Sequence, residues 1–130
     1  MATYWIAVGA PGCGKSRWGK SFNGLVVCPD SIVDERFQGE DSHRAHAYDI
    51  ACEQIQSALE KGTDVYLDAT NVFRIRRERM IAAGKQYADR VICVWFDTPY
   101  DVCVARHKAA VTASERESPR YTAHTEAYED

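Results

Sequence analysis

A small α/β fold built on a parallel sheet is predicted by three observations. Four short apolar runs rich in β-branched and aromatic residues are spread along the chain, and helical patterns lie between them. A glycine-rich turn joins the first run to the first helical stretch. The chain has 130 residues, which fits one domain over residues 1–130 with a modest core.

The predicted strands are nearly continuous in apolarity. Such runs are typical of strands that are covered on both faces, as in parallel sheets. In chain order they are residues 3–8 (TYWIAV), 25–28 (LVVC), 64–68 (DVYLD) and 91–96 (VICVWF).

Helices are predicted between and after these strands, over residues 15–22, 42–61, 72–88 and about 99–110. The second places apolar side chains on one face at helical spacing, and Gly62 follows as its C-terminal stop. Thr98 and Pro99 are typical of a helix cap followed by a first-turn proline. Residues 112–130 are polar and are expected to form a lid, a short helix or a frayed tail.

Composition argues against several classes of protein. The formal net charge is -3, so a broad basic surface for duplex nucleic acid is not expected, although a local basic groove stays open. No apolar run reaches the roughly 18–20 residues that span a membrane, and no signal-peptide pattern is seen. The 5 cysteines form no Cys-x-x-Cys pair, which argues against a disulfide framework or zinc site and favours a reducing cytoplasm. Cys28 and Cys93 lie in apolar runs and are predicted to be core residues.

The stretch after the first strand fits the pattern G-x-x-x-x-G-K-[ST]. Glycines at this density let successive backbone N–H groups point at an anion, and the following helix adds its positive end. A plain glycine-rich turn is the alternative. The pattern predicts binding of ATP or another NTP, with Lys15 acting on the β- and γ-phosphates and Ser16 ligating Mg²⁺. The predicted nucleotide-binding residues are Gly9, Ala10, Pro11, Gly12, Cys13, Gly14, Lys15 and Ser16.

Two aspartates follow predicted strands. They are expected in the same crevice, because ligands bind beyond the carboxyl ends of the strands in open α/β sheets. Asp68 is predicted to hold the magnesium directly or through a water. Its alternative is a cap for the next helix, for which Asn71 is the better candidate. Asp30 is predicted to be the catalytic base that takes the proton of an acceptor hydroxyl. Its alternatives are an N-cap for a helix over 31–37 and a group that supports the metal.

Arginines supply the positive charge that phosphoryl transfer needs. Arg106 is predicted to contact the γ-phosphate as a catalytic residue, and a charge that complements the helix dipole is its alternative. Other arginines crowd the helix start after Asp68. One or two of them are expected to bind a substrate phosphate, unless they only form a solvated face. The candidates in that group are Arg74, Arg76 and Arg77.

Together these residues resemble the polynucleotide 5′-kinase branch of P-loop kinases. The similarity runs over about residues 3–108. It is carried by the loop 9–16 with Trp18, Asp30, Asp68-Ala-Thr-Asn71 with Arg76 and Arg77, and Phe96-Asp97-Thr-Pro99 leading to Arg106. The resemblance implies a P-loop kinase fold with strand order 2-3-1-4. It also implies that an acid after the second strand is the general base and that arginines bind the acceptor phosphate and the γ-phosphate.

The sequence departs from this family at two arginine positions. No arginine follows Asp30 at the usual short distance, and the nearest one, Arg36, is expected to bind the substrate instead. The lid position four residues after Arg106 is Ala110, where Arg116 or Arg120 would have to substitute.

Three functions are compatible with these patterns. The motif set favours a kinase that transfers the γ-phosphate of ATP to a 5′-hydroxyl of DNA or RNA. The acidic net charge and the missing arginine favour a kinase for a small molecule: a nucleoside, a nucleotide, a modified base or an antibiotic. The third function is a nucleotide-binding module without transfer chemistry. No membrane partner is expected.

Overall fold

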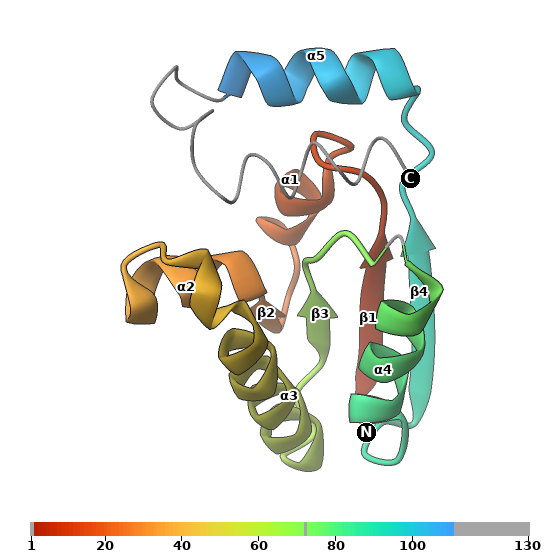
Figure 1. Cartoon of the computed structure of the whole chain (residues 1–130). Helices are drawn as coiled ribbons and strands as arrows, with labels where there is room; N and C mark the ends of the chain where they lie inside the picture. The colour runs from red at the N-terminus through yellow and green to blue at the C-terminus, as the bar shows by residue number, and fades with distance from the viewer. Residues whose placement is uncertain (1, 72, 111–130) are drawn as a thin grey trace.

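The computed structural model describes residues 2–71 and 73–110. Its centre is a four-stranded parallel sheet with the order β2-β3-β1-β4 (Figure 1), which confirms the predicted strand order. All predicted strands are present, and two of them are shorter than their apolar runs. The strands are β1 (Thr3–Val8), β2 (Leu25–Val27), β3 (Val65–Leu67) and β4 (Arg90–Trp95).

The predicted helices are confirmed with shorter limits, and α2 is a further helix that the sequence indicated only as an alternative. The described helices are α1 (Lys15–Gly19), α2 (Pro29–Phe37), α3 (Arg44–Glu60), α4 (Arg74–Lys85) and α5 (Tyr100–Ala110), with a 3-10 turn η1 (Asp41–His43) before α3. The expected stop after α3 also holds. Gly62 has a φ of 82°, and the Thr63 amide donates to the Ala58 carbonyl at 2.9 Å, which closes the helix end.

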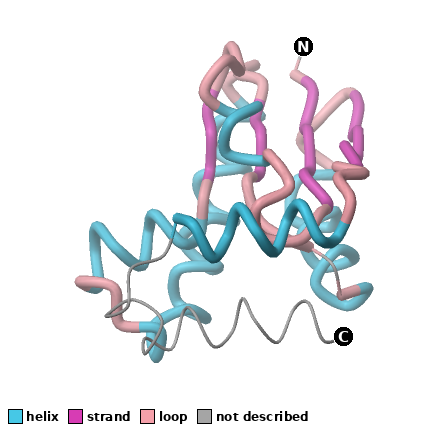
Figure 2. Tube along the Cα trace, turned by 90° about the horizontal axis from the view of Figure 1, so that it is seen from above, coloured by secondary structure: helices cyan, strands magenta, loops and turns pink. Residues whose placement is uncertain are grey.

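Helices lie on both faces of the sheet (Figure 2). On one face, α4 packs against β1 and α3 packs against β2 and β3. Tyr4 of β1 is fully buried on this face, and its hydroxyl donates to the Met80 carbonyl at 2.8 Å. On the other face lies α1. Its Trp18 ring is 5.9 Å from the Trp5 ring and 4.7 Å from the Tyr66 ring, centroid to centroid. The neighbouring residues Tyr4 and Trp5 therefore serve opposite layers, as the two-residue period of a strand requires.

The edge strand β4 departs from the prediction. Cys93 is exposed, so its assignment to the core is wrong, and Cys28 is only half-buried. The reason is position, because β4 pairs with β1 alone and lies at the edge of the sheet. Trp95 at its end is 72% exposed, whereas Tyr66 in the inner strand β3 is fully buried.

The carboxyl ends of the strands converge at one edge of the sheet, where α5 lies (Figure 1). This is the edge at which the sequence places its candidate site. The predicted lid or tail at 112–130 lies outside the described residues. Within the described part of the chain, no helix combines the length and the apolar character needed to cross a membrane.

Candidate active site

The glycine-rich loop leaves β1 and ends at the start of α1. Gly12 and Gly14 have φ values of 84° and 108°, which side chains with a Cβ rarely adopt. Gly9 is required for another reason, since a Cβ there would lie 2.5 Å from the Cys13 sulfur. Glycine is therefore needed at Gly12 and Gly14 for a positive φ and at Gly9 for lack of space.

Lys15 is the first residue of α1, and it is 8% exposed. Its Nζ donates to the Ala10 carbonyl at 2.9 Å and lies 3.6 Å from the Cys13 sulfur, so the side chain folds back over the loop. The Tyr66 hydroxyl of β3 donates to the Lys15 carbonyl at 2.8 Å. Burial raises the pKa of Tyr66. The loop end is therefore fastened to the neighbouring strand by a neutral, buried phenol.

Ser16, in α1, and Asp68, which follows β3, are joined by a hydrogen bond. The Ser16 hydroxyl donates to Asp68 Oδ2 at 2.7 Å, and Asp68 is 7% exposed. Burial raises the pKa of Asp68, while the Ser16 hydrogen bond and the Lys15 charge act in the opposite direction. A hydroxyl and a carboxylate side by side are oxygen donors of the kind that Mg²⁺ takes together with substrate phosphates. Among the described residues, no three His, Cys, Asp or Glu side chains form a group that could hold a metal by themselves.

Asn71 does not cap α4, so the prediction that it is the better cap is wrong. Helix α4 begins at Arg74, its N-cap residue is Phe73, and no side-chain hydrogen bond caps its N-terminus. Asn71 is 1% exposed with a φ of 49°, and its Nδ2 donates to the Ala7 carbonyl at 2.8 Å. An N-cap acts through its side-chain oxygen, but the Asn71 side chain is held at β1, where its Nδ2 satisfies a buried carbonyl. Asn71 thereby fixes the loop after Asp68 to β1. Asn71 Oδ1 is buried there without a hydrogen-bond partner among the described residues.

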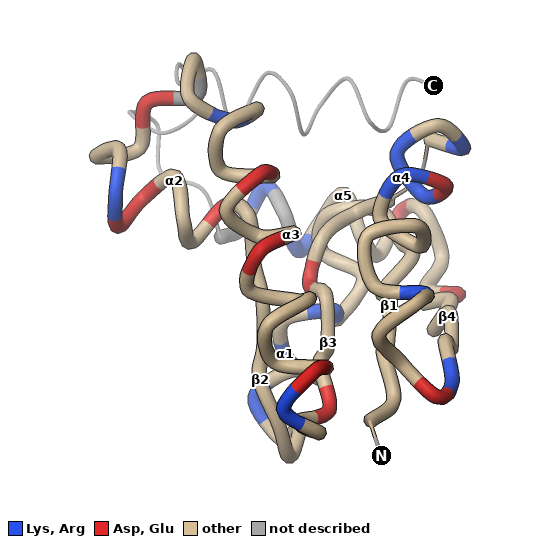
Figure 3. The backbone as a smooth tube through the Cα atoms, turned by 90° about the horizontal axis from the view of Figure 1, so that it is seen from below, with Lys and Arg blue, Asp and Glu red and all other residues tan. Residues whose placement is uncertain are grey.

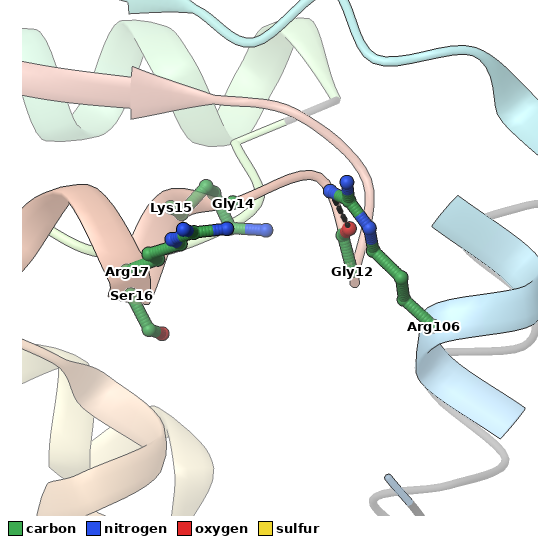
Figure 4. Close-up of a pocket in the computed structure, with 6 residues that line it drawn as sticks. All are labelled: Gly12, Gly14, Lys15, Ser16, Arg17 and Arg106. Atoms are coloured by element: carbon green, nitrogen blue, oxygen red, sulfur yellow. Dashed lines mark hydrogen bonds between the residues drawn. The ribbon is translucent and has the colours of Figure 1, made fainter. Parts of the chain in front are cut away.

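A pocket of about 300 Å³ opens at the glycine-rich loop (Figure 4). It is lined by Gly12, Gly14, Lys15, Ser16, Arg17 and Arg106. Arg106 reaches it from α5, and its Nη1 donates to the Gly12 carbonyl at 3.5 Å. The Thr98 hydroxyl, before α5, donates to the Cys13 carbonyl at 2.8 Å. The structure thus brings Arg106 to the loop, as expected, and adds Arg17, which no motif indicated.

Asp30 lies in the first turn of α2, just past β2. The cap position of α2 is Cys28, so Asp30 is not the N-cap that the sequence allowed as an alternative. Arg44, at the start of α3, places its Nη1 2.6 Å from Asp30 Oδ1, and both side chains are partly exposed. The Asp30 charge contributes to raising the pKa of Asp68, which brings both carboxylates into one electrostatic neighbourhood.

Arg76, one of the predicted substrate arginines, is linked to this pair through Tyr48. Its guanidinium carbon is 4.3 Å from the centroid of the Tyr48 ring in α3. Burial raises the pKa of Tyr48, Arg76 opposes this effect, and the charges of Asp30 and Arg44 also act on it. We call Asp30, Arg44, Tyr48 and Arg76 the Asp30 cluster. Its members come from three helices: Asp30 from α2, Arg44 and Tyr48 from α3, and Arg76 from α4.

The other predicted substrate arginines lie outside this cluster. Arg77 donates to the Asn71 carbonyl at 3.3 Å, and Arg74 pairs with Glu78 on the exposed face of α4. Arg36 is exposed in the last turn of α2. Sequence reasoning missed Arg44, although its place at the start of the predicted helix 42–61 was a usable signal.

Comparisons with known proteins bear on the family and the fold of this chain. A family model described as an AAA domain (AAA_33) matches residues 5–130, whereas no curated protein sequence matches the chain. Two chains from structures of the Pnkp1/Rnl/Hen1 complex, one described as an RNA repair complex, have TM-scores of 0.72 and 0.78. They are 23% and 22% identical to this chain, and the matches cover 90% and 98% of it. A candidate kinase from Chloroflexus aurantiacus has a TM-score of 0.67 at 17% identity, covering 89% of this chain and 73% of its own.

The matches cover only 43% and 44% of the two Pnkp1-complex chains, so this chain spans less than half of their length. At these identities the likeness concerns the fold. The family match and the sheet order lead to the same conclusion: the chain belongs to the AAA_33 family of AAA domains and has the fold of polynucleotide-kinase-like P-loop kinases.

Proposed function

We propose that this chain is an ATP-dependent kinase that transfers the γ-phosphate to a 5′-hydroxyl of DNA or RNA. The observation that carries the proposal is the position of Asp30. It follows β2 at the edge where the glycine-rich loop ends β1 and Asp68 ends β3, and its charge acts on Asp68. A phosphate-binding loop beside a partly exposed carboxylate is the pairing that phosphoryl transfer to a hydroxyl requires.

On the donor side, Lys15 and Arg106 would stabilise the negative charge that spreads over the moving phosphoryl group. Both already lie at the pocket, Lys15 on the loop and Arg106 over Gly12. Ser16 and Asp68 are the residues that would hold Mg²⁺, whose charge neutralises the phosphates when it is bound. Because Tyr66 and Asn71 fasten the surrounding backbone, the backbone of the site needs little rearrangement to receive a nucleotide.

On the acceptor side, Asp30 would orient the hydroxyl and take its proton. The hydroxyl oxygen then forms a bond to the γ-phosphorus, and the bond from that phosphorus to the bridging oxygen breaks. The electron pair of the broken bond leaves on ADP. Arg44 compensates the charge of the Asp30 carboxylate at 2.6 Å and holds it at the crevice.

Two features support a polynucleotide acceptor. Arg44 places its guanidinium beside Asp30, and Arg76 places its guanidinium over Tyr48 of the same cluster, which suits an acceptor that carries a phosphate near its hydroxyl. The fold neighbours from the Pnkp1/Rnl/Hen1 complex belong to an RNA repair assembly, and the motif resemblance points the same way.

The alternative is a small-molecule acceptor, and the charge distribution favours it. The net charge is -3, and acidic segments predominate along α2 and α3 beside the cluster, whereas α4 carries mostly arginine (Figure 3). An extended polyanion would meet repulsion along α2 and α3, because like charges raise the free energy of the complex.

A transfer assay with γ-labelled ATP and Mg²⁺ tests the proposal. The acceptors are a 5′-hydroxyl DNA oligonucleotide, the matching RNA, and a pool of nucleosides and nucleotides. Label on an oligonucleotide, with a KM that rises steeply with salt, is the expected result. Label on a small molecule alone would move the acceptor class. No label on any acceptor, with ATP still bound, would overturn the kinase assignment in favour of a nucleotide-binding module.

A further inference from the structure

Arg17 is a cation at the pocket that the proposed mechanism does not use. It lies two residues after Lys15 in α1, and its side chain lines the pocket together with the loop glycines. Arg17 is exposed, and within the described residues its guanidinium has no hydrogen bond or ion pair. By contrast, protein groups contact the guanidinium of each of four other arginines near the site, Arg44, Arg76, Arg77 and Arg106.

The guanidinium groups of Arg17 and Arg106 reach the pocket from different helices. Figure 4 shows Arg17 extending from α1 and Arg106 entering from α5, with the loop residues between them. Three cationic side chains, Lys15, Arg17 and Arg106, therefore line one pocket of about 300 Å³, and no acidic residue is among its lining residues. Such a site suits a chain of several phosphates, because guanidinium groups bind phosphate oxygens in pairs.

Lys15, Arg17 and Arg106 lie at different places in the pocket, so each is expected to bind a different part of the phosphate chain. Lys15 is buried against the loop, where a P-loop lysine acts on the β- and γ-phosphates, and Arg106 lies over Gly12 at the same end. Arg17 follows Ser16 along α1 and remains at the exposed mouth of the pocket. We propose that Arg17 binds the α-phosphate of the nucleotide, the phosphate that is attached to the nucleoside. This inference rests on the proposed function only in requiring that the pocket takes a nucleotide.

A charge that merely complements the C-terminus of α1 is the competing explanation, since Arg17 lies in the last turn of this helix. A charge with that role alone would not contact a bound nucleotide, so its removal would not change nucleotide affinity. The two explanations therefore predict different results for Arg17→Ala: only a contact to the α-phosphate predicts weaker binding of every nucleotide that carries this phosphate.

The test is calorimetric binding of ATP and ADP, each with Mg²⁺, and of AMP to the wild type, Arg17→Ala, Arg17→Lys, Arg106→Ala and Lys61→Ala. Lys61 is an exposed lysine at the end of α3, so its replacement removes the same charge away from the pocket. We expect Arg17→Ala to raise all three dissociation constants by the same factor, about 5- to 30-fold, since one charge-assisted contact is lost. Arg17→Lys should restore part of the affinity. Arg106→Ala should weaken ATP more than ADP, and Lys61→Ala should change none of the three by more than about 2-fold.

The outcomes separate this inference from the proposed function. If Arg17→Ala binds ATP and ADP as tightly as Lys61→Ala does, Arg17 has no role in the site. If it weakens ATP alone, or ATP and ADP but not AMP, Arg17 acts on the γ- or the β-phosphate and the α-phosphate assignment is wrong. A wild type that binds neither ATP nor ADP would overturn the proposed function itself, whereas nucleotide binding without phosphate transfer would leave the Arg17 assignment standing.

Discussion

The glycine-rich loop and the Asp30 cluster lie at the same edge of the sheet, but they are held by different interactions. The loop is fastened by buried or partly buried hydrogen bonds to backbone carbonyls, such as those from Tyr66 to Lys15 and from Thr98 to Cys13. The cluster is held by long side chains from three helices, joined by the partly exposed Asp30–Arg44 pair and the Arg76–Tyr48 contact.

This difference indicates a division of labour. A site whose backbone is fixed before ligand arrives suits a ligand that never varies, which is the triphosphate of the nucleotide. Ion pairs between partly exposed side chains exchange partners at little cost in free energy, which suits an acceptor that has to enter and leave. Variants in the two regions should therefore have different consequences for nucleotide binding and for acceptor use.

Lys15→Met keeps the aliphatic stem of the side chain and removes the charge that lies over the loop. We expect the transfer rate to fall by about 100- to 1000-fold, because one preorganised cation at the moving phosphoryl group is lost. ATP affinity should fall as well, by about 10-fold or more. The matched control is Lys20→Met, an exposed lysine just past α1. Equal transfer rates for the two variants would contradict the assignment of Lys15.

Arg44→Ala breaks the contact to Asp30 without touching the loop. We expect transfer to fall by about 5- to 30-fold through the acceptor KM and kcat, while the ATP dissociation constant changes by less than about 2-fold. Arg79→Ala breaks a more exposed pair with Asp49, away from the site, and should leave both quantities unchanged. Steady-state kinetics with varied acceptor provide the measurement. Weaker ATP binding by Arg44→Ala would mean that the two regions are not separate.

Asp68→Asn should reveal a conflict between stability and function at the loop. Burial raises the pKa of Asp68 in the folded state above its ordinary value of 3.8. The folded state therefore binds more protons than the unfolded state as pH rises through this window, so the ionised carboxylate lowers stability at neutral pH. We expect the variant to gain about 2–5 °C in Tm at pH 7, a gain that disappears near pH 4, and to lose transfer activity.

Thermal unfolding followed by circular dichroism at both pH values measures this effect. Asp49→Asn, which removes an exposed carboxylate from α3, is the control and should show no gain. A Tm for Asp68→Asn that equals or falls below that of the wild type at pH 7 would contradict the role of burial.

The same division explains what the sequence could predict. The loop was predictable because its glycines, Lys15 and Ser16 are contiguous and their spacing follows from backbone geometry. The strand order followed from the family resemblance. Asp30 and Asp68 could be placed in one crevice because parallel strands end at a common edge.

The acceptor side and the sheet edge could not be read in this way. Arg44 reaches Asp30 across 14 residues, and their contact depends on how α2 and η1 turn the chain back on itself. The environment of Cys93 depends on β4 being an edge strand, and the partner of Asn71 is a carbonyl 64 residues away. Arg17 belongs to no pattern, and only the shape of the pocket draws attention to it.

The most direct test of the central claim compares Asp30→Asn with Asp34→Asn. Asp34 lies one turn further along α2, so both variants replace a carboxylate by an amide on the same helix. Each is assayed for ATP binding and for transfer from γ-labelled ATP to a 5′-hydroxyl oligonucleotide. We predict that Asp30→Asn loses transfer while its ATP dissociation constant stays within about 3-fold of the wild type, and that Asp34→Asn keeps both. Full transfer by Asp30→Asn would show that Asp30 is not the catalytic base.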